Sequence, residues 1–189
     1  MIMLERAYLI PLIPLIASLV MLCFKEDERS PAPYLGIAAM LWCLIQSCAI
    51  FYGVAAGSVT LPYEANIEWF RLAVDVGGKA FAYTMPLGVL IDGPAAVMLV
   101  VVTLVSALVQ IYSTAYMHGD PRYRRYFAFL SFFTASMLGL VVSSNLLVTF
   151  MCWELVGVSS YLLIGFWFEK AGPAYASKKA FITTKLGDC

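Results

Sequence analysis

Residues 150–168 read FMCWELVGVSSYLLIGFWF, an apolar run that contains one carboxylate, Glu154. Such a run is long enough, at about 1.5 Å per residue of α-helix, to cross most of a hydrocarbon core of about 30 Å. Glu154 follows Asn145, where the helix is expected to begin, by a rise of roughly 13 Å, which places it near the bilayer centre. An ionised carboxylate there costs at least about 2.5–3.5 kcal/mol. The stretch therefore predicts a membrane helix whose Glu154 faces protein rather than lipid.

The helical face that carries Glu154 also carries two glycines. The residues on this face, at steps of three and four, are Gly157, Tyr161 and Gly165. Glycine lets a second helix approach closely, so we expect this face to point into a helix bundle. Because desolvation disfavours the anion, we expect Glu154 to take up and release protons near neutral pH.

The composition is typical of a membrane protein. The chain is 62% hydrophobic, against roughly 45–50% in soluble domains. The apolar segments long enough to span a bilayer lie at about 7–24, 34–57, 93–117, 126–143 and 146–168. A sixth opens near Pro173 and has no stop signal by Cys189, so we expect the chain to continue. The predicted fold is an all-α polytopic membrane protein with five complete transmembrane helices and the start of a sixth.

Charge and cysteine patterns exclude several classes of protein. The 12 basic and 12 acidic residues cancel, and no basic patch favours nucleic acid. Five cysteines form no C-x-x-C pair, and His118 is the single histidine, so this chain alone supplies no zinc or iron–sulfur ligand set. We therefore expect no metal and no bound cofactor on this chain, and cysteines that serve as packing residues.

Basic residues predict the orientation in the membrane. One side holds Lys25, Arg29, Arg122, Arg124, Arg125, Lys170, Lys178 and Lys179. The other side holds only Arg6, Arg71 and Lys79. By the positive-inside rule the N-terminus faces away from the cytoplasm, which in a bacterial inner membrane is the periplasm. We expect the arginines of the 116–126 loop to set this topology and to contact lipid headgroups.

The longest loop, residues 58–92, falls on the periplasmic side. Two β-prone runs, WFRLAVDV and KAFAYTM, flank Gly77 and Gly78, a pattern typical of a β-hairpin with a tight turn. This gives three regions: helices in 1–57, the hairpin loop in 58–92 and a helical bundle in 93–189. Asp92, before Gly93-Pro94, is interpreted as a helix cap, with an ion-handling role as the alternative.

A second polar face lies on the segment at 93–117. Its members, at steps of three, four and three, are Thr103, Ser106, Gln110 and Ser113. Hydrogen-bonding side chains of this kind commonly hold membrane helices together, which is the favoured interpretation. The alternative is that they line a hydrated path.

Lys185 and Asp188 are charged residues in the sixth segment. Lys185 lies roughly 18 Å past Pro173, again inside the membrane, and Asp188 follows at i+3. A cation near Glu154 would favour its ionised form, and movement of that cation toward Asp188 would favour proton uptake. One hypothesis is thus a proton switch made by Glu154, Lys185 and Asp188. The other is a static ion cluster that holds helices together.

Five stretches of the chain carry a resemblance to a known family: IDGPAAVML, YMHGDPRYRRYFAFLSFFTASML, SSNLL, CWELVGVSSYLLIGFWFEK and KKAFITTKLGD. Together they cover about half of the chain, and they resemble the antiporter-like family of respiratory complex I membrane subunits, which includes subunit L and its mitochondrial counterpart, subunit 5. The resemblance implies a proton-conducting bundle in which Glu154, Lys185 and Asp188 belong to the proton path. Many relatives carry arginine where this chain has Lys185.

The same resemblance implies the setting of the protein. It predicts a subunit of an NADH:quinone oxidoreductase translocase with no redox chemistry of its own. NAD, FMN, iron–sulfur clusters and quinone would then belong to partner subunits, and its partners would be other membrane-arm subunits and the lipid bilayer. The alternative is a subunit of an Mrp-type cation/proton antiporter, or the equivalent subunit of a membrane hydrogenase or an inorganic-carbon transporter.

Overall fold

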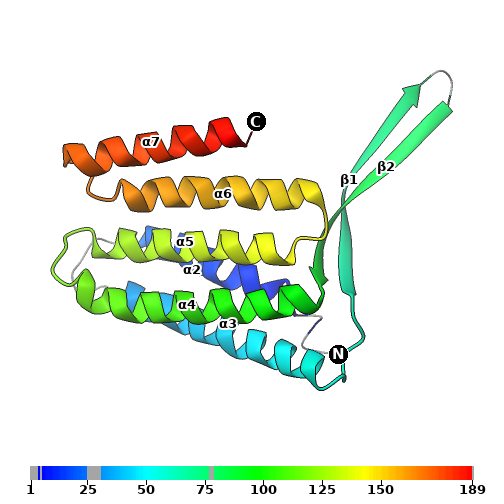
Figure 1. The fold of residues 1–189 in the computed structure, drawn as a ribbon, viewed down its shortest axis with the longest axis horizontal. Helices are drawn as coiled ribbons and strands as arrows, with labels where there is room; N and C mark the ends of the chain where they lie inside the picture. Colours follow the sequence, from blue (N-terminus) through cyan, green and yellow to red (C-terminus); the bar gives the residue numbers. More distant parts are fainter. Residues whose placement is uncertain (1–3, 5, 25–30, 77–78, 189) are drawn as a thin grey trace.

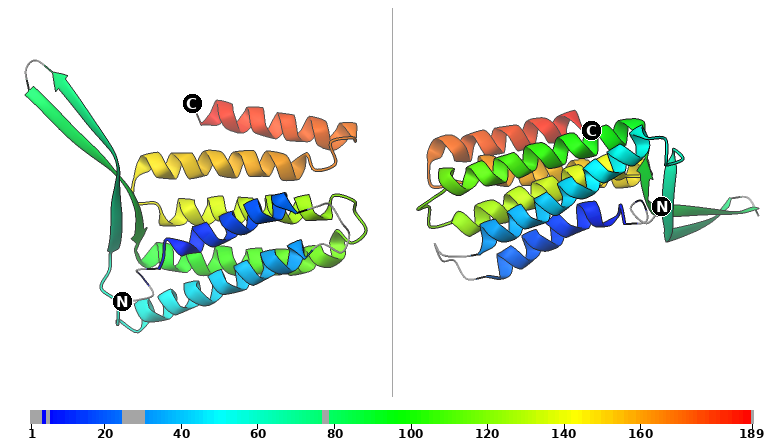
Figure 2. Two further views of the ribbon diagram at one scale, coloured as in Figure 1. Left: turned by 180° about the vertical axis from the view of Figure 1, so that it is seen from behind. Right: turned by 90° about the horizontal axis from the view of Figure 1, so that it is seen from below.

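The computed structural model describes residues 4, 6–24, 31–76 and 79–188, and these form a helical bundle with one β-hairpin at its end (Figure 1). The helices are α2 (Leu9–Cys23), α3 (Ala32–Ala55), α4 (Gly93–Tyr116), α5 (Tyr123–Val142), α6 (Leu146–Ile164) and α7 (Ala171–Gly187). Their long axes run side by side, and the hairpin projects away from one end of the bundle (Figures 1 and 2).

Four of these helices, α3 to α6, are long and apolar enough to cross a membrane. The chain is therefore a multi-pass membrane protein. The prediction of five complete spans is not confirmed, because α2 has only 15 residues. It covers about 22 Å, less than a hydrocarbon core of about 30 Å. The helix is bounded by its cap residues Tyr8 and Phe24, so it is shorter than the 7–24 span expected from the sequence.

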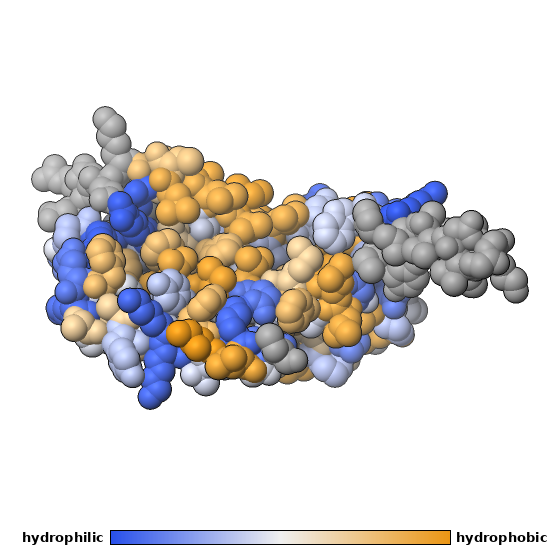
Figure 3. All heavy atoms as spheres, turned by 90° about the horizontal axis from the view of Figure 1, so that it is seen from above, coloured by the Kyte–Doolittle hydropathy of each residue, from blue (hydrophilic) through white to orange (hydrophobic). Residues whose placement is uncertain are grey.

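Helix α5 lies at the centre of the bundle. It packs against α2, α4, α6 and α3, and it buries the largest share of its residues among the four candidate spans. Helix α6 buries the smallest share and carries α7 on its other side. Hydrophobic side chains dominate one broad face of the bundle, with hydrophilic ones gathered at the end opposite the hairpin (Figure 3).

The hairpin confirms the strand prediction and is longer than the two runs that predicted it. Strand β1 (Tyr63–Val76) pairs antiparallel with β2 (Lys79–Ile91), from Tyr63↔Ile91 to Val76↔Lys79. The register shifts once, between Glu68 and Phe70. The expected Gly77-Gly78 turn lies outside the described residues. Strand β2 leads directly into α4, whose first turn is capped by Asp92 Oδ1, which accepts from Ala95 N at 2.8 Å. The capping role predicted for Asp92 is confirmed.

The base of the hairpin is joined to the corner between α5 and α6. Ser144 N donates to Gly88 O at 3.3 Å, and Asn145 Nδ2 donates to Pro86 O. Asn145 also caps α6, because its Oδ1 accepts from Val148 N at 2.9 Å. A Cβ atom on Gly88 would lie 2.8 Å from Ala65 O and 2.6 Å from Ser144 Oγ, so only glycine fits there. The start of the helix that carries Glu154 is thus fixed to the hairpin.

Candidate functional site

Glu154 of α6 and Lys185 of α7 form an ion pair. Each side chain is 29% exposed, so the pair lies between the two helices without being sealed inside the protein. Lys185 Nζ also lies 5.3 Å from the centre of the Phe181 ring, a cation–π arrangement. The carboxylate at position 154 is therefore turned toward a basic side chain of the neighbouring helix.

Glycines on α6 allow the two helices to approach. A Cβ atom on Gly165 would lie 2.9 Å from Ser177 Oγ of α7, and Ser177 is only 3% exposed. A Cβ atom on Gly157 would lie 3.9 Å from Lys185 Nζ. Between them, the rings of Tyr161 and Phe181 meet with centroids 5.4 Å apart. Helix α7 thus packs against the predicted face of α6, which is made of Glu154, Gly157, Tyr161 and Gly165.

Asp188, at the end of α7, contacts α6. Its Oδ1 accepts a hydrogen bond from Trp153 Nε1 at 3.0 Å. Within residues 79–188, no ion pair joins it to Lys185, because Lys185 extends across the helix interface to Glu154. This is the first of the two positions that the switch hypothesis gives to Lys185. Trp153 was not predicted as a partner of Asp188, although the indole N–H of a tryptophan in an apolar helix usually needs an acceptor.

The second polar face, on α4, points toward α5. Its hydrogen bonds are Ser106–Thr134 at 3.2 Å, Gln110–Ser131 at 3.2 Å and Ser113–Tyr126 at 3.4 Å. Thr103 is fully buried and donates to Leu99 O of its own helix. The partners on α5 were not predicted, because periodicity does not tell which helix a polar face will meet. This set lies in the α4–α5 interface, whereas Glu154 and Lys185 lie between α6 and α7.

Gln110 joins three helices. It is fully buried, its Nε2 donates to Ser131 of α5, and its Oε1 would be 2.8 Å from a Cβ atom on Gly36 of α3. That close approach depends on the absence of a side chain at position 36. These contacts support the packing interpretation of the α4 polar face.

Two residues of the 116–126 segment, Arg124 and Asp120, form hydrogen bonds with other parts of the protein. Arg124 is only 7% exposed, and its Nη1 donates to Met21 O and Leu22 O at 2.6 Å each, at the end of α2. The expectation that it contacts lipid headgroups is wrong, because its guanidinium satisfies the free carbonyls of a helix end. Asp120 Oδ2 accepts from Trp167 Nε1 at 2.9 Å, which ties the loop to the end of α6.

Comparison with known proteins identifies relatives for nearly the whole chain. Residues 79–127 match the family described as NADH-ubiquinone oxidoreductase (complex I), chain 5 N-terminus. Residues 143–189 match the family described as NADH:quinone oxidoreductase/Mrp antiporter, transmembrane region. The second match includes Glu154, Lys185 and Asp188.

Individual relatives agree with these families. The chain is 42% identical to NAD(P)H-quinone oxidoreductase subunit 5 of the Nephroselmis olivacea chloroplast, over 97% of this chain and 28% of the relative. It is also 42% identical to F(420)H(2) dehydrogenase subunit L of Methanosarcina mazei, over 97% of this chain and 25% of the relative. The chain thus spans about a quarter of the length of the curated relatives it matches.

A solved structure has the same fold. A chain of the membrane-bound sulfane sulfur reductase, an archaeal respiratory membrane complex, superposes with a TM-score of 0.71 at 17% identity. The superposition covers 98% of this chain and 34% of the other. The bundle and hairpin described above are therefore a known arrangement.

Proposed function

Because the chain belongs to the antiporter-like family of respiratory complex I membrane subunits, we propose that it forms the N-terminal part of a proton-translocating subunit of an NADH:quinone oxidoreductase. It carries one end of a proton path, made by Glu154, Lys185 and Asp188. The electron-transfer steps take place on other subunits.

The observation that supports this proposal is the ion pair between Glu154 of the membrane helix α6 and Lys185 of the neighbouring helix α7. Intramembrane charges are costly and usually mark ion or proton pathways. While Lys185 lies beside Glu154, the carboxylate is favoured over the protonated acid. If Lys185 moves away, the low-polarity surroundings favour proton uptake by Glu154. The pair can therefore couple a small movement of a cation to the binding of a proton.

Asp188 is the proposed second position for Lys185. Its carboxylate now accepts from Trp153 Nε1 at 3.0 Å, next in sequence to Glu154. If Lys185 moved toward Asp188, the Asp188 carboxylate would accept from the charged Lys185 ammonium in place of the neutral Trp153 indole. Asp188 follows Lys185 at i+3, a spacing at which two side chains of one helix can pair.

The redox cofactors are proposed to reside on partner subunits. Iron–sulfur clusters need sets of cysteine or histidine ligands, and the described residues contain no group of three side chains that could hold a metal ion. The described residues therefore supply no ligand set that fits a cluster. NAD, FMN, the clusters and quinone would be bound elsewhere in a complex, and this chain would contact other membrane-arm subunits and lipid.

The proposed location is a bacterial inner membrane with the N-terminus on the periplasmic side. This orientation follows from the excess of basic residues at the opposite ends of the helices. We also propose that α2 crosses the membrane, because a span shorter than the hydrocarbon core is tolerated by local thinning of the bilayer.

An Mrp-type cation/proton antiporter subunit is the second candidate, with the equivalent subunit of a membrane hydrogenase or an inorganic-carbon transporter in the same class. It is favoured by the match at residues 143–189, whose family includes Mrp antiporters by description. The two candidates differ in what co-purifies with the full-length protein. Flavin and iron–sulfur absorbance would support the oxidoreductase, and sodium-dependent pH changes in vesicles would support the antiporter.

Substitutions in the full-length subunit, within its complex, test the proton path. Proton translocation is measured in vesicles with a pH-sensitive dye, and assembly is measured on native gels. We expect Glu154→Gln and Lys185→Ala to reduce translocation strongly while the complex still assembles, and Lys185→Arg to retain most of it. Glu169→Gln is the control, because Glu169 is an exposed carboxylate just beyond α6.

Two outcomes would contradict the proposal. Normal translocation by an assembled Glu154→Gln complex would remove Glu154 from the proton path. An equal loss of assembly in Glu154→Gln and Lys185→Ala would instead indicate a static ion cluster.

A further inference from the structure

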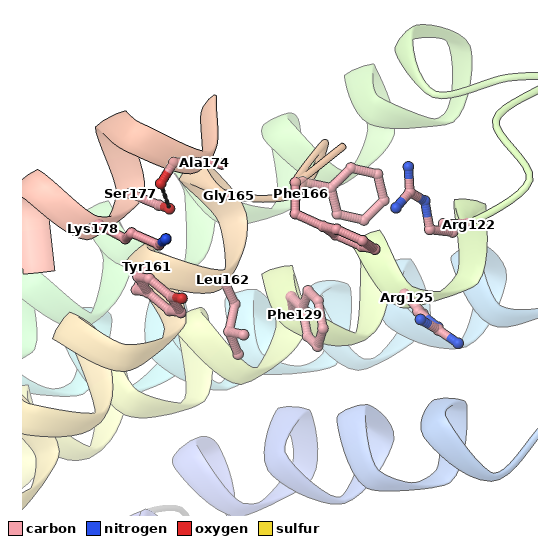
Figure 4. Close-up of a pocket in the computed structure, with 11 residues that line it drawn as sticks. Arg122, Arg125, Phe129, Tyr161, Leu162, Gly165, Phe166, Ala174, Ser177 and Lys178 are labelled. Atoms are coloured by element: carbon pink, nitrogen blue, oxygen red, sulfur yellow. Dashed lines mark hydrogen bonds between the residues drawn. The ribbon is translucent and has the colours of Figure 1, made fainter. Parts of the chain in front are cut away.

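A pocket of about 410 Å³ opens between the start of α5, the end of α6 and the first turns of α7 (Figure 4). Three basic side chains line it: Arg122, Arg125 and Lys178. Lys178 lies at one end and the two arginines lie toward the other, with Phe129, Leu162 and Phe166 between them (Figure 4). The pocket thus combines cationic ends with an apolar and aromatic middle.

The charged side chains among the described residues that line the pocket are all basic. No Asp or Glu is among the described residues that line it. Arg122 Nη1 lies 3.5 Å from Glu169 Oε1, but the Glu169 side chain is 72% exposed and lies outside the lining. A carboxylate that exposed is strongly screened by solvent and can turn away at little cost. Arg122 is otherwise held over the rings of Phe166 and Phe168, at 5.6 Å and 4.8 Å from their centres.

The pocket lies where a lipid headgroup would meet the protein. Arg122 and Arg125 are at the start of α5, and Lys178 is in the second turn of α7. These parts of the two helices lie toward the end of the bundle opposite the hairpin (Figure 1). The apolar residues of the pocket belong to α5, α6 and the turn that follows α6. Basic pockets between membrane helices on the cytoplasmic side are suited to anionic lipid headgroups.

We propose that this pocket binds the phosphate headgroup of an anionic phospholipid, with its acyl chains along the aromatic wall. The cations at both ends supply charge-assisted hydrogen bonds to phosphate oxygens. Free phosphate would use only these cations and would leave the apolar middle unfilled. A zwitterionic lipid would fill the apolar middle, but its own cationic group would be repelled. An anionic phospholipid satisfies both parts of the pocket.

Photo-crosslinking in the intact membrane complex tests this site. The complex that contains the full-length chain is placed in phosphatidylcholine bilayers with a photoactivatable analogue of either phosphatidylglycerol or phosphatidylcholine. Mass spectrometry then measures crosslinks to peptides from residues 122–129 and 161–178. We expect phosphatidylglycerol to label these peptides at least about fivefold more than phosphatidylcholine, the factor typical of one basic contact near a membrane surface.

Two neighbouring lysines give a matched pair of variants. Lys178→Gln removes a cation that lines the pocket, whereas Lys179→Gln removes an exposed cation next to it in sequence that does not. We expect Lys178→Gln to reduce phosphatidylglycerol labelling about fivefold and Lys179→Gln to change it less than twofold. Lys178 and Lys179 are both exposed, so both variants should assemble. If the Lys178→Gln complex does not assemble, the labelling ratio of the two lipids in the unmodified complex still tests whether the pocket prefers an anionic headgroup.

Several results would overturn the proposal. Equal labelling by the two lipids would show that headgroup charge is not recognised. Equal effects of both substitutions would indicate a general surface attraction. Displacement of the lipid by millimolar inorganic phosphate would assign the site to free phosphate. Absence of any label on these peptides would show that protein, rather than lipid, fills the pocket.

Discussion

Gly165→Ala should loosen the contact between α6 and α7, and the structure gives the size of the effect. The new Cβ atom would lie 2.9 Å from Ser177 Oγ, 3.1 Å from Ser177 Cβ and 3.2 Å from Tyr161 O. Ser177 is buried and donates to Ala174 O of its own helix, so it cannot turn aside freely. Overpacking of this kind typically costs about 1–3 kcal/mol.

Gly157→Ala is the matched control on the same face of α6. Its Cβ atom would meet only Lys185 Nζ, at 3.9 Å, which is an ordinary van der Waals contact. Gly157 lies inside the helix, where alanine is favoured over glycine by up to about 1 kcal/mol, whereas Gly165 is the C-cap and gains little. Gly165→Ala should therefore destabilise the contact between α6 and α7, whereas Gly157→Ala should leave it intact and stabilise α6.

Hydrogen–deuterium exchange of α7 peptides measures the difference. In the full-length protein in lipid nanodiscs, a cost of about 1–3 kcal/mol corresponds to roughly 5- to 140-fold faster exchange in α7 if local opening controls the rate. Ser177→Gly, added to Gly165→Ala, removes both close contacts on α7 and should restore slow exchange. The reasoning is refuted if Gly165→Ala leaves exchange unchanged, or if Gly157→Ala accelerates it equally.

Three further predictions concern helix caps and buried polar contacts. Asp92→Ala should lower the free energy of unfolding by about 0.5–2 kcal/mol through loss of the α4 cap, seen as a lower thermal midpoint; an equal drop in Asp92→Asn would contradict this. Ser131→Ala should lower the free energy of unfolding by about 1–3 kcal/mol, because it leaves the buried Gln110 amide without its partner on α5. Adding Gln110→Leu should recover much of this stability, and a further loss of stability would contradict the prediction. Arg124→Gln should speed hydrogen exchange in the last turn of α2, since charged donors to two carbonyls are worth about 1.5–3 kcal/mol each; unchanged exchange there would be inconsistent with the observed contacts.

The membrane helices were predictable because apolar length and helix caps are local properties. The expected spans at 93–117 and 146–168 correspond to α4 (Gly93–Tyr116) and α6 (Leu146–Ile164). Asp92 and Asn145 stand at the expected starts of these helices and cap them. The first span was predicted as complete because its apolar run was counted without regard to where the helix would end.

The side-chain pairings were only partly predictable. Glu154 and Lys185 could be expected to meet, because the sequence predicts that each charge lies inside the membrane, where it needs an opposite charge. The Trp153–Asp188 bond and the contact of Arg124 with α2 depend on which helices are neighbours. Short-range periodicity carries no such information, so these contacts required the three-dimensional structure.

Gly88 limits how this protein can vary in evolution. Any side chain at that position would collide with Ala65 of the opposite strand and with Ser144 at the α5–α6 corner. Insertions or deletions toward the tip of the hairpin would leave these neighbours untouched, whereas a shift of one residue at its foot would reposition the start of α6. We expect homologous sequences to differ in hairpin length while glycine persists at position 88, so that the depth of Glu154 in the membrane stays constant.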